Sequence, residues 1–167
     1  MQWILPGTVL EADQQEAEHV QALLQPMFLA GGMVLSQVSS ITGLEPYIIQ
    51  NWVKRGFLAP PRNKRYTLRQ LCRILNINML KGVLPMERIC GMLGYINGAL
   101  DDESDDLIDD SALYFMFVRL AVRARELDRT GEWDSAIAQV LRVMVVGYIA
   151  SRMKQEAEHL LAEMSFA

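Results

Sequence analysis

The side chains best suited to chemistry lie on one face of a short predicted helix, residues 46–55. Apolar residues recur within it at helical spacing and define a buried face, which includes Trp52. The opposite face then carries a phenol, two amides and two cations, which are groups that bond to base edges and phosphates in nucleic acids. These candidate contact residues are Tyr47, Gln50, Asn51, Lys54 and Arg55.

A second group of cations follows in a loop, residues 59–66, whose adjacent prolines exclude a helix. We expect a β-turn or a small wing. Arg62, Lys64 and Arg65 are placed there to contact phosphates. Tyr66 is included among the candidate contacts, with two alternatives: it packs beneath the wing, or it touches the sugar backbone.

The net charge of −4 is distributed unevenly along the 167 residues. Residues 1–34 carry four acids and no Lys or Arg, and residues 99–167 have a net charge of −7. Residues 35–98 carry nine Lys or Arg against two acids, a net charge of +7. A basic block inside an acidic chain is typical of a module that binds a polyanion, although a solvated surface is the alternative.

Local signals predict the elements that position these side chains. Ser36 is expected to cap a helix of two turns that Gly43 ends, and Pro46 then opens the second helix. Thr67 forms a capping box with Gln70 at the start of a third helix, and a fourth helix runs from Pro85 to Asn97. Two short helices, a basic wing and a capped third helix are the parts of a winged helix-turn-helix.

At these residues the sequence resembles the DNA-binding domain of the mercury-resistance-regulator (MerR-like) family. The features that match in order are Pro46, Trp52, Gly56-Phe57, Lys64 and Tyr66, followed by the helix at residues 84–89. Roughly residues 35–97 are also similar to the bacterial family called domain of unknown function 1836, itself considered MerR-like, through the segments 49–56, 64–67 and 74–81. The resemblance implies a winged helix-turn-helix that binds double-stranded DNA.

Two residues depart from the MerR-like pattern. Glu45 stands where the resemblance implies a Ser or Thr cap, and an acid there weakens one backbone contact to DNA. Asn51 replaces the first of the usual aromatic pair. The cysteines of metal-sensing members have no counterpart at matching positions, so the resemblance carries over no metal site.

The expected fold class is all-α, or mainly α with a minimal β wing. An acidic run, residues 101–110, marks the clearest boundary, and it does not match a calcium loop. Helices at about 111–128 and 134–164, split by a turn at 129–132, follow it. The expected parts are an N-terminal arm and helix (1–34, the helix at about 11–29), the winged helix-turn-helix domain (35–98), an acidic linker (99–110) and a C-terminal helical hairpin (111–167).

The C-terminal helices are expected to pack together and to hold two copies of the chain as a homodimer. The stripe on the last helix is too wide for one partner helix, and it comprises Ile137, Val140, Leu141, Met144, Tyr148 and Ile149. A pocket for a small-molecule effector of unknown identity is the alternative to a core or dimer surface there.

Other residues indicate neither catalysis nor a metal or cofactor. Cys72 and Cys90 lie in apolar helical patterns and are expected in the core, while His19 and His159 are isolated. We find no nucleophile–base pair or phosphate loop, so an enzyme is not expected. No charge-free stretch reaches the roughly 18 residues of a membrane span, and no secretory signal is evident, so a cytoplasmic protein without membrane partners is expected.

Two function hypotheses remain. The first is a homodimeric transcription regulator that reads a pseudo-palindrome, and it predicts salt-sensitive binding to duplex DNA. The second is a protein–protein interaction adaptor built on a winged-helix scaffold, and it predicts no DNA affinity at moderate salt.

Overall fold

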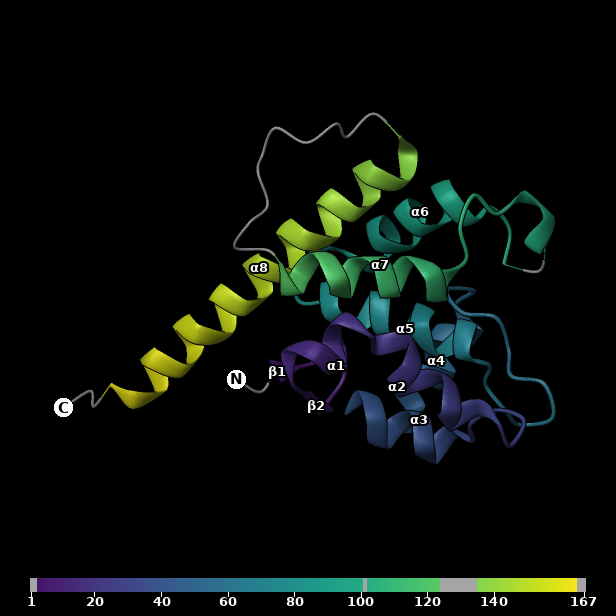
Figure 1. The fold of residues 1–167 in the computed structure, drawn as a ribbon, viewed down its shortest axis with the longest axis horizontal. Helices are drawn as coiled ribbons and strands as arrows, with labels where there is room; N and C mark the ends of the chain where they lie inside the picture. Colours follow the sequence, from purple (N-terminus) through teal and green to yellow (C-terminus); the bar gives the residue numbers. More distant parts are fainter. Residues whose placement is uncertain (1–2, 101, 124–134, 165–167) are drawn as a thin grey trace.

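The computed structural model describes residues 3–100, 102–123 and 135–164. Within them the chain is mainly helical, with a single small β-hairpin (Figure 1). The predicted fold class, mainly α with minimal β, is confirmed. The expected turn at residues 129–132 and the ends of the helices beside it lie outside the described residues.

The N-terminal segment differs from the single helix expected at about 11–29. Strands β1 (Trp3–Ile4) and β2 (Glu11–Ala12) form an antiparallel hairpin. The helical part is divided into α1 (Gln14–Glu18), α2 (Val20–Leu24) and a 3-10 turn, η1 (Gln25–Phe28).

Local backbone chemistry explains the division of that helix. Asp13 accepts a hydrogen bond from the backbone N–H of Glu16, at 2.8 Å, which starts α1 only after the hairpin. His19 leaves the α region, with φ −113° and ψ 36°. Pro26 follows in η1, where its ring prevents the chain from continuing as a regular α-helix.

The middle of the chain follows the local signals closely. Helices α3 (Leu35–Thr42) and α4 (Pro46–Lys54) are joined at Gly43, whose φ of 70° permits the left-handed turn. α5 (Leu68–Leu80) begins with the predicted Thr67 capping box, and α6 (Met86–Asn97) ends before Gly98.

One predicted cap in this region is wrong. Val34, not Ser36, precedes the first turn of α3, so Ser36 is already inside the helix. The backbone N–H of Val34 is satisfied instead by the side chain of Gln37, at 3.0 Å. A long amide that reaches back from the first turn replaces the short hydroxyl that the sequence suggested.

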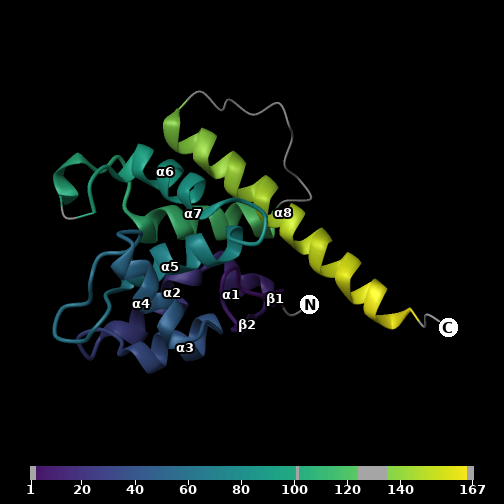
Figure 2. The ribbon, with the colours of Figure 1, turned by 180° about the vertical axis from the view of Figure 1, so that it is seen from behind.

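α5 lies at the centre of the molecule and packs against α3, α6, α7 (Asp110–Val122) and α8 (Ala136–Glu163), while α7 also packs against α1 and α2 (Figures 1 and 2). One continuous cluster of buried apolar residues includes members from all of these helices. At residue 147 of α8, where the chain has glycine, an added Cβ would lie 2.6 Å from the side chain of Leu80. Helices on both sides of the acidic run therefore share a core.

The acidic run itself is only partly solvated. A 3-10 turn, η2 (Glu103–Asp105), interrupts it, and Asp110 is buried at the start of α7. The expectation of a solvated linker or helix start therefore holds for its exposed members and not for its last aspartate.

α8 changes environment along its length. Its first half packs against α5, α6 and α7, whereas its second half extends away from the rest of the molecule (Figure 1). By length and composition alone, α8 is the one helix within the described residues that is apolar enough to cross a membrane. Core helices meet the same criteria, and Val140, Leu141 and Met144 are indeed buried in the core.

Candidate nucleic-acid interface

The outward face of α4 carries the predicted polar side chains. Ile49 and Trp52 face inward and are buried, which confirms the prediction that Trp52 packs in the core. Tyr47 is 67% exposed. The other exposed polar side chains on this helix are Gln50, Asn51 and Lys54. The amphipathic pattern therefore separates a packing face from a face that is available to a ligand.

The basic loop closes in a two-residue turn. The backbone N–H of Arg62 donates to the carbonyl of Arg65, at 3.2 Å, and the reverse bond measures 2.9 Å. The two central residues, Asn63 and Lys64, have φ of 50° and 60°. Positive φ at both central positions is the geometry of a type I′ hairpin turn, so the turn holds its cations in one defined arrangement.

Backbone and side-chain bonds fix the base of this turn. Met33 and Tyr66 exchange two backbone hydrogen bonds, of 2.9 and 2.7 Å, which join the residues before α3 to the end of the loop. On the other side, the amide of Gln70 donates to the carbonyls of Ala59 and Pro60, at 3.2 and 3.0 Å. The turn is therefore tied both to the segment before α3 and to α5.

Tyr66 packs in the core at the base of the turn, although it also lines the groove between α4 and the turn. It is 2% exposed, and burial raises the pKa of its hydroxyl. Of the two alternatives considered for it, the structure has the side chain beneath the turn. The aromatic residue that follows the cations therefore packs where the end of the loop is bonded to the segment before α3.

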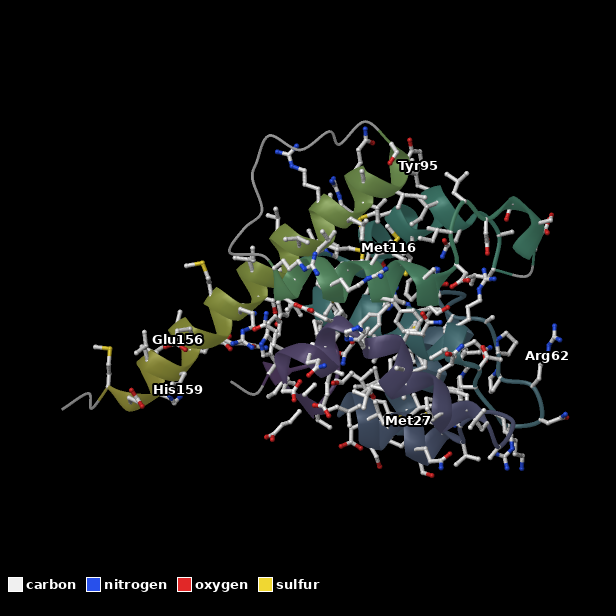
Figure 3. All side chains as sticks on the ribbon, viewed as in Figure 1. Met27, Arg62, Tyr95, Met116, Glu156 and His159 are labelled. Atoms are coloured by element: carbon white, nitrogen blue, oxygen red, sulfur yellow. The ribbon has the colours of Figure 1, made fainter. Side chains whose placement is uncertain are left out.

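A shallow groove brings α4 and the turn together. Gln50 and Val53 of α4 line one part of it, and Pro61 and Lys64 of the loop line another. The first residues of α3 complete the groove, which encloses about 570 Å³. Figure 3 shows Arg62 pointing outward at the end of this part of the molecule. Candidate residues from two separate sequence segments thus border one surface.

Two of the predicted cations have partners within the protein. Arg55 forms a 3.0 Å ion pair with Glu87 of α6, and its guanidinium lies 4.5 Å from the ring centroid of Phe57. Arg65 donates a hydrogen bond to the carbonyl of Gly32, at 3.2 Å, while remaining exposed. These contacts hold both arginines in place, and they lower the availability of Arg55 in particular.

A polar ladder beside α5, defined as Arg69, Arg73, Asn76, Asp106 and Asp110, was not expected from the sequence. Arg73, Asn76 and Asp110 are buried, and Arg69 and Asp106 are partly buried. Arg69 forms an ion pair with Asp106, and Arg73 Nη1 lies 3.5 Å from Asp110 Oδ1. The Asn76 amide donates to the backbone carbonyl of Asp110, at 3.3 Å. The two arginines are four residues apart, as are the two aspartates, and this matching spacing is the signal that could have indicated the ladder.

Burial dominates the electrostatics of the ladder. Desolvation raises the pKa of Asp110 to about 6, although the cations of Arg73 and Arg69 oppose the shift. Burial, together with Asp110 and Asp109, also raises the pKa of the Cys72 thiol well above its usual value. Cys72 is therefore a buried neutral thiol, as expected for a core residue, and Cys90 is a half-buried free thiol.

In the described part of the chain, no three His, Cys, Asp or Glu side chains come together as a set of metal ligands.

Comparison with known families identifies the class of the protein. Residues 20–117 match the model of the family described as Domain of unknown function (DUF1836), and the chain belongs to that family. The matched segment includes α3 to α6, the basic turn and most of α7.

One relative among curated proteins is the "Uncharacterized protein YkrK" of Bacillus subtilis (strain 168). It is 32% identical over 84 residues, and the match covers 48% of this chain and 36% of the relative. The chain thus matches about a third of the length of that relative. No solved structure matches the chain.

Proposed function

We propose that this protein is a transcription regulator that binds double-stranded DNA through a MerR-like winged helix-turn-helix. The element order supports the proposal, because two helices joined by a tight glycine turn precede a hairpin turn and a third helix. The bonds between Met33 and Tyr66 also support it, since they tie the turn to the segment that enters α3. In this proposal α4 is the recognition helix and residues 62–65 are the wing.

The observation that carries the proposal is the groove shared by α4 and the turn. Gln50 and Lys64 line it from opposite segments, so a side chain able to read bases lies beside a cation able to neutralise a phosphate. Gln50 and Asn51 are the proposed base readers, since amides bond well to adenine edges. The proposed phosphate contacts are Lys54, Arg62, Lys64 and Arg65, with Tyr47 at the exposed start of α4.

The experiment is fluorescence anisotropy of a labelled, mixed-sequence DNA duplex titrated with the full chain at several salt concentrations. Three to four phosphate contacts per subunit give a log–log salt slope of roughly −5 to −7 for a dimer. Folded protein that binds no duplex even at low salt would contradict the proposal. In that case the alternative, a protein–protein interaction adaptor on a winged-helix scaffold, would be favoured.

We also propose that the protein is a homodimer through α8. Exposed apolar side chains follow a spacing of three and four residues along this helix, which is the seam of a coiled coil. A second copy of the chain offers a seam with the same period, and the extended second half of α8 is free to receive it (Figure 1). The seam residues are Val143, Val146, Ala150, Met153, Ala157, Leu160 and Met164.

Light scattering after size exclusion tests the dimer. Met153→Glu introduces a charge at the centre of the seam, and we expect it to shift the protein from dimer to monomer. Gln155→Glu adds the same charge two residues away and outside the seam, so it should leave the dimer intact. A wild-type monomer at all concentrations, or an equal effect of both variants, would contradict this interface.

We also propose a cytoplasmic location for the protein, as part of the proposed regulator function.

A further inference from the structure

A pocket of about 390 Å³ lies beside the part of α8 from which the second half of this helix extends away from the molecule (Figure 1). Side chains within residues 148–155 of α8 form one wall, and residues 78–82 at the end of α5 form a second. The loop of the β1–β2 hairpin, residues 4–8, forms the third. This volume is large enough for a small organic molecule, and the pocket shares no lining residue with the groove of α4 and the turn.

Contacts within the fold hold the hairpin wall of the pocket in place. The Asn78 amide donates to the carbonyl of Gly7, at 3.0 Å, and the Tyr114 hydroxyl donates to the carbonyl of Pro6, at 2.7 Å. The backbone of Gly7 lies so close to α5 that an added Cβ would be 2.5 Å from the carbonyl oxygen of Leu75. The pocket is therefore largely preformed, which lowers the entropic cost of binding a ligand.

The charged side chains that line the pocket are both cations. Lys81 and Arg152 are exposed, and within the part of the chain that the structure describes neither forms an ion pair with an acid. Among the described residues that line the pocket, none is Asp or Glu. In a chain with a net charge of −4, such a lining favours an anion.

Two hydroxyl groups add neutral donors beside these cations. The ring of Tyr148 packs edge-on against Phe117, with ring centroids 5.7 Å apart, so its hydroxyl has a defined position. Burial raises the pKa of Tyr148, while Arg152, which is hydrogen-bonded to the hydroxyl, opposes the shift. Because a guanidinium only donates, the phenol keeps its own proton to donate to a ligand. Ser151 provides the second hydroxyl.

We propose that this pocket binds a small phosphate ester. A phosphate group carries about two negative charges and three strong acceptor oxygens, which match two cations and two hydroxyl donors. A carboxylate carries one charge and is satisfied by a single arginine, so it matches this lining less well. The phosphate accepts from Lys81, Arg152 and the hydroxyl of Tyr148, and the organic part of the ester packs against Ile4 and Met79.

Isothermal titration calorimetry of the full chain, without DNA and in a phosphate-free buffer, tests the binding. The probes are phenyl phosphate, glycerol 3-phosphate and inorganic phosphate, and we expect saturable binding that is tightest for phenyl phosphate. Benzoate has the same ring with a carboxylate, so it should bind at least about tenfold more weakly than phenyl phosphate. No saturable binding of any phosphate, or benzoate that binds as tightly as phenyl phosphate, would overturn the proposal.

Two double variants that remove the same charge locate the site. Lys81→Ala with Arg152→Ala removes both cations of the pocket and should weaken the binding of phenyl phosphate at least about tenfold. Arg142→Ala with Lys154→Ala removes two exposed cations of α8 that do not line the pocket, so the affinity should stay within about twofold of the wild type. All four side chains are exposed, so both variants should keep the Tm of the wild type.

Tyr148→Phe separates a built site from attraction by charge alone. It keeps the ring that packs against Phe117 and all of the charges, and it removes only the hydroxyl, so we expect several-fold weaker binding of phenyl phosphate. The inference would be overturned by an unchanged affinity in this variant, by equal losses in the two double variants, or by binding that survives Lys81→Ala with Arg152→Ala. Because no DNA is present, these failures are distinct from a failure of the proposed regulator function.

Discussion

Four arginines within residues 62–73 have two different environments. Arg62 and Arg65 lie in the turn and are exposed, whereas Arg69 and Arg73 lie on α5 and form ion pairs with Asp106 and Asp110. The residue type and the stretch of sequence are the same. What differs is the presence of an aspartate opposite the guanidinium, so one pair holds the fold together and the other is available to a polyanion.

Ion pairs within the protein neutralise part of the basic block, residues 35–98. Arg55, Arg69 and Arg73 belong to its nine cations, and each has an acidic partner in the folded chain. Two of those partners come from the acidic run, which the sequence analysis treated as a separate linker. The net charge of +7 for residues 35–98 therefore overstates the charge that faces a ligand, and the surface that remains is concentrated on α4 and the turn.

Arg73→Ala should have the largest effect, and it tests whether the paired arginines stabilise the fold. It leaves Asp110 buried beside an empty space, so we expect a loss of about 3–5 kcal/mol in the free energy of unfolding, measured by urea denaturation. Arg62→Ala removes an exposed side chain and should change this free energy by less than about 0.5 kcal/mol. Equal losses in the two variants would remove the distinction between the two pairs of arginines.

For DNA affinity we expect the opposite: loss of an exposed arginine should have a larger effect than loss of an arginine in an ion pair. Arg62→Ala should weaken binding by about tenfold and reduce the salt slope by about 1 per subunit, because one phosphate contact is lost. Arg55→Ala removes a guanidinium that is already paired with Glu87, so a smaller effect is expected. Anisotropy titrations measure both, and a larger effect of Arg55→Ala would contradict this assignment.

The pH dependence of the free energy of unfolding tests the environment of Asp110, the ion-pair partner of Arg73. The pKa of Asp110 is raised to about 6 by burial, despite Arg73 and Arg69 and in the same direction as Asp106 and Asp109. A carboxyl whose pKa is higher in the folded state than in the unfolded state binds a proton preferentially in the folded state. The contribution of Asp110 to the free energy of unfolding thus rises by about 1 kcal/mol as the pH falls from about 7 to 5.

Asp110→Asn checks this sign. Denaturation at several pH values should show that the variant lacks the rise seen for the wild type between these two pH values, whatever its stability at pH 7. A wild-type minus variant difference that stays constant with pH would show that Asp110 does not titrate in this range.

Lys64→Gly gives the smallest expected change, and it separates stability from binding in the exposed region. Lys64 has a φ of 60°, which glycine adopts without strain, so we expect a gain of about 0.5–1 kcal/mol in the free energy of unfolding. The same change removes a phosphate contact and should weaken DNA binding several-fold. A variant with stronger DNA binding would show that the turn does not contact DNA through Lys64.

The elements from α3 to α6 could be predicted because their signals are local. Gly43, Pro46 and the Thr67 capping box each act on the backbone within one turn, and the structure has all three where the sequence indicated them. The N-terminal helix was wrong because the breaks at His19 and Pro26 compete with a continuous apolar pattern. The apolar periodicity predicted one helix over about residues 11–29, but the β1–β2 hairpin and the Asp13 cap delay its start.

The candidate site was predictable only in part, since exposure follows from packing between distant segments. The outward face of α4 follows from its own apolar stripe. Tyr66 is buried because Met33, far away in the sequence, pairs with it. The polar ladder depends on the approach of residues 106–110 to α5, and the spacing within a single segment does not show that approach.

The most direct test of the central claim compares two double variants that remove the same charges. Arg62→Ala with Lys64→Ala changes the turn, while Lys81→Ala with Arg152→Ala changes an exposed lysine and an exposed arginine that line a different pocket. Anisotropy titration against salt should show the turn variant losing on the order of 100-fold in affinity and about 2 units of salt slope per subunit, with the control within about twofold of the wild type. Equal losses in the two variants would mean that net charge alone attracts the DNA, and the assignment of α4 and the turn as the interface would be wrong.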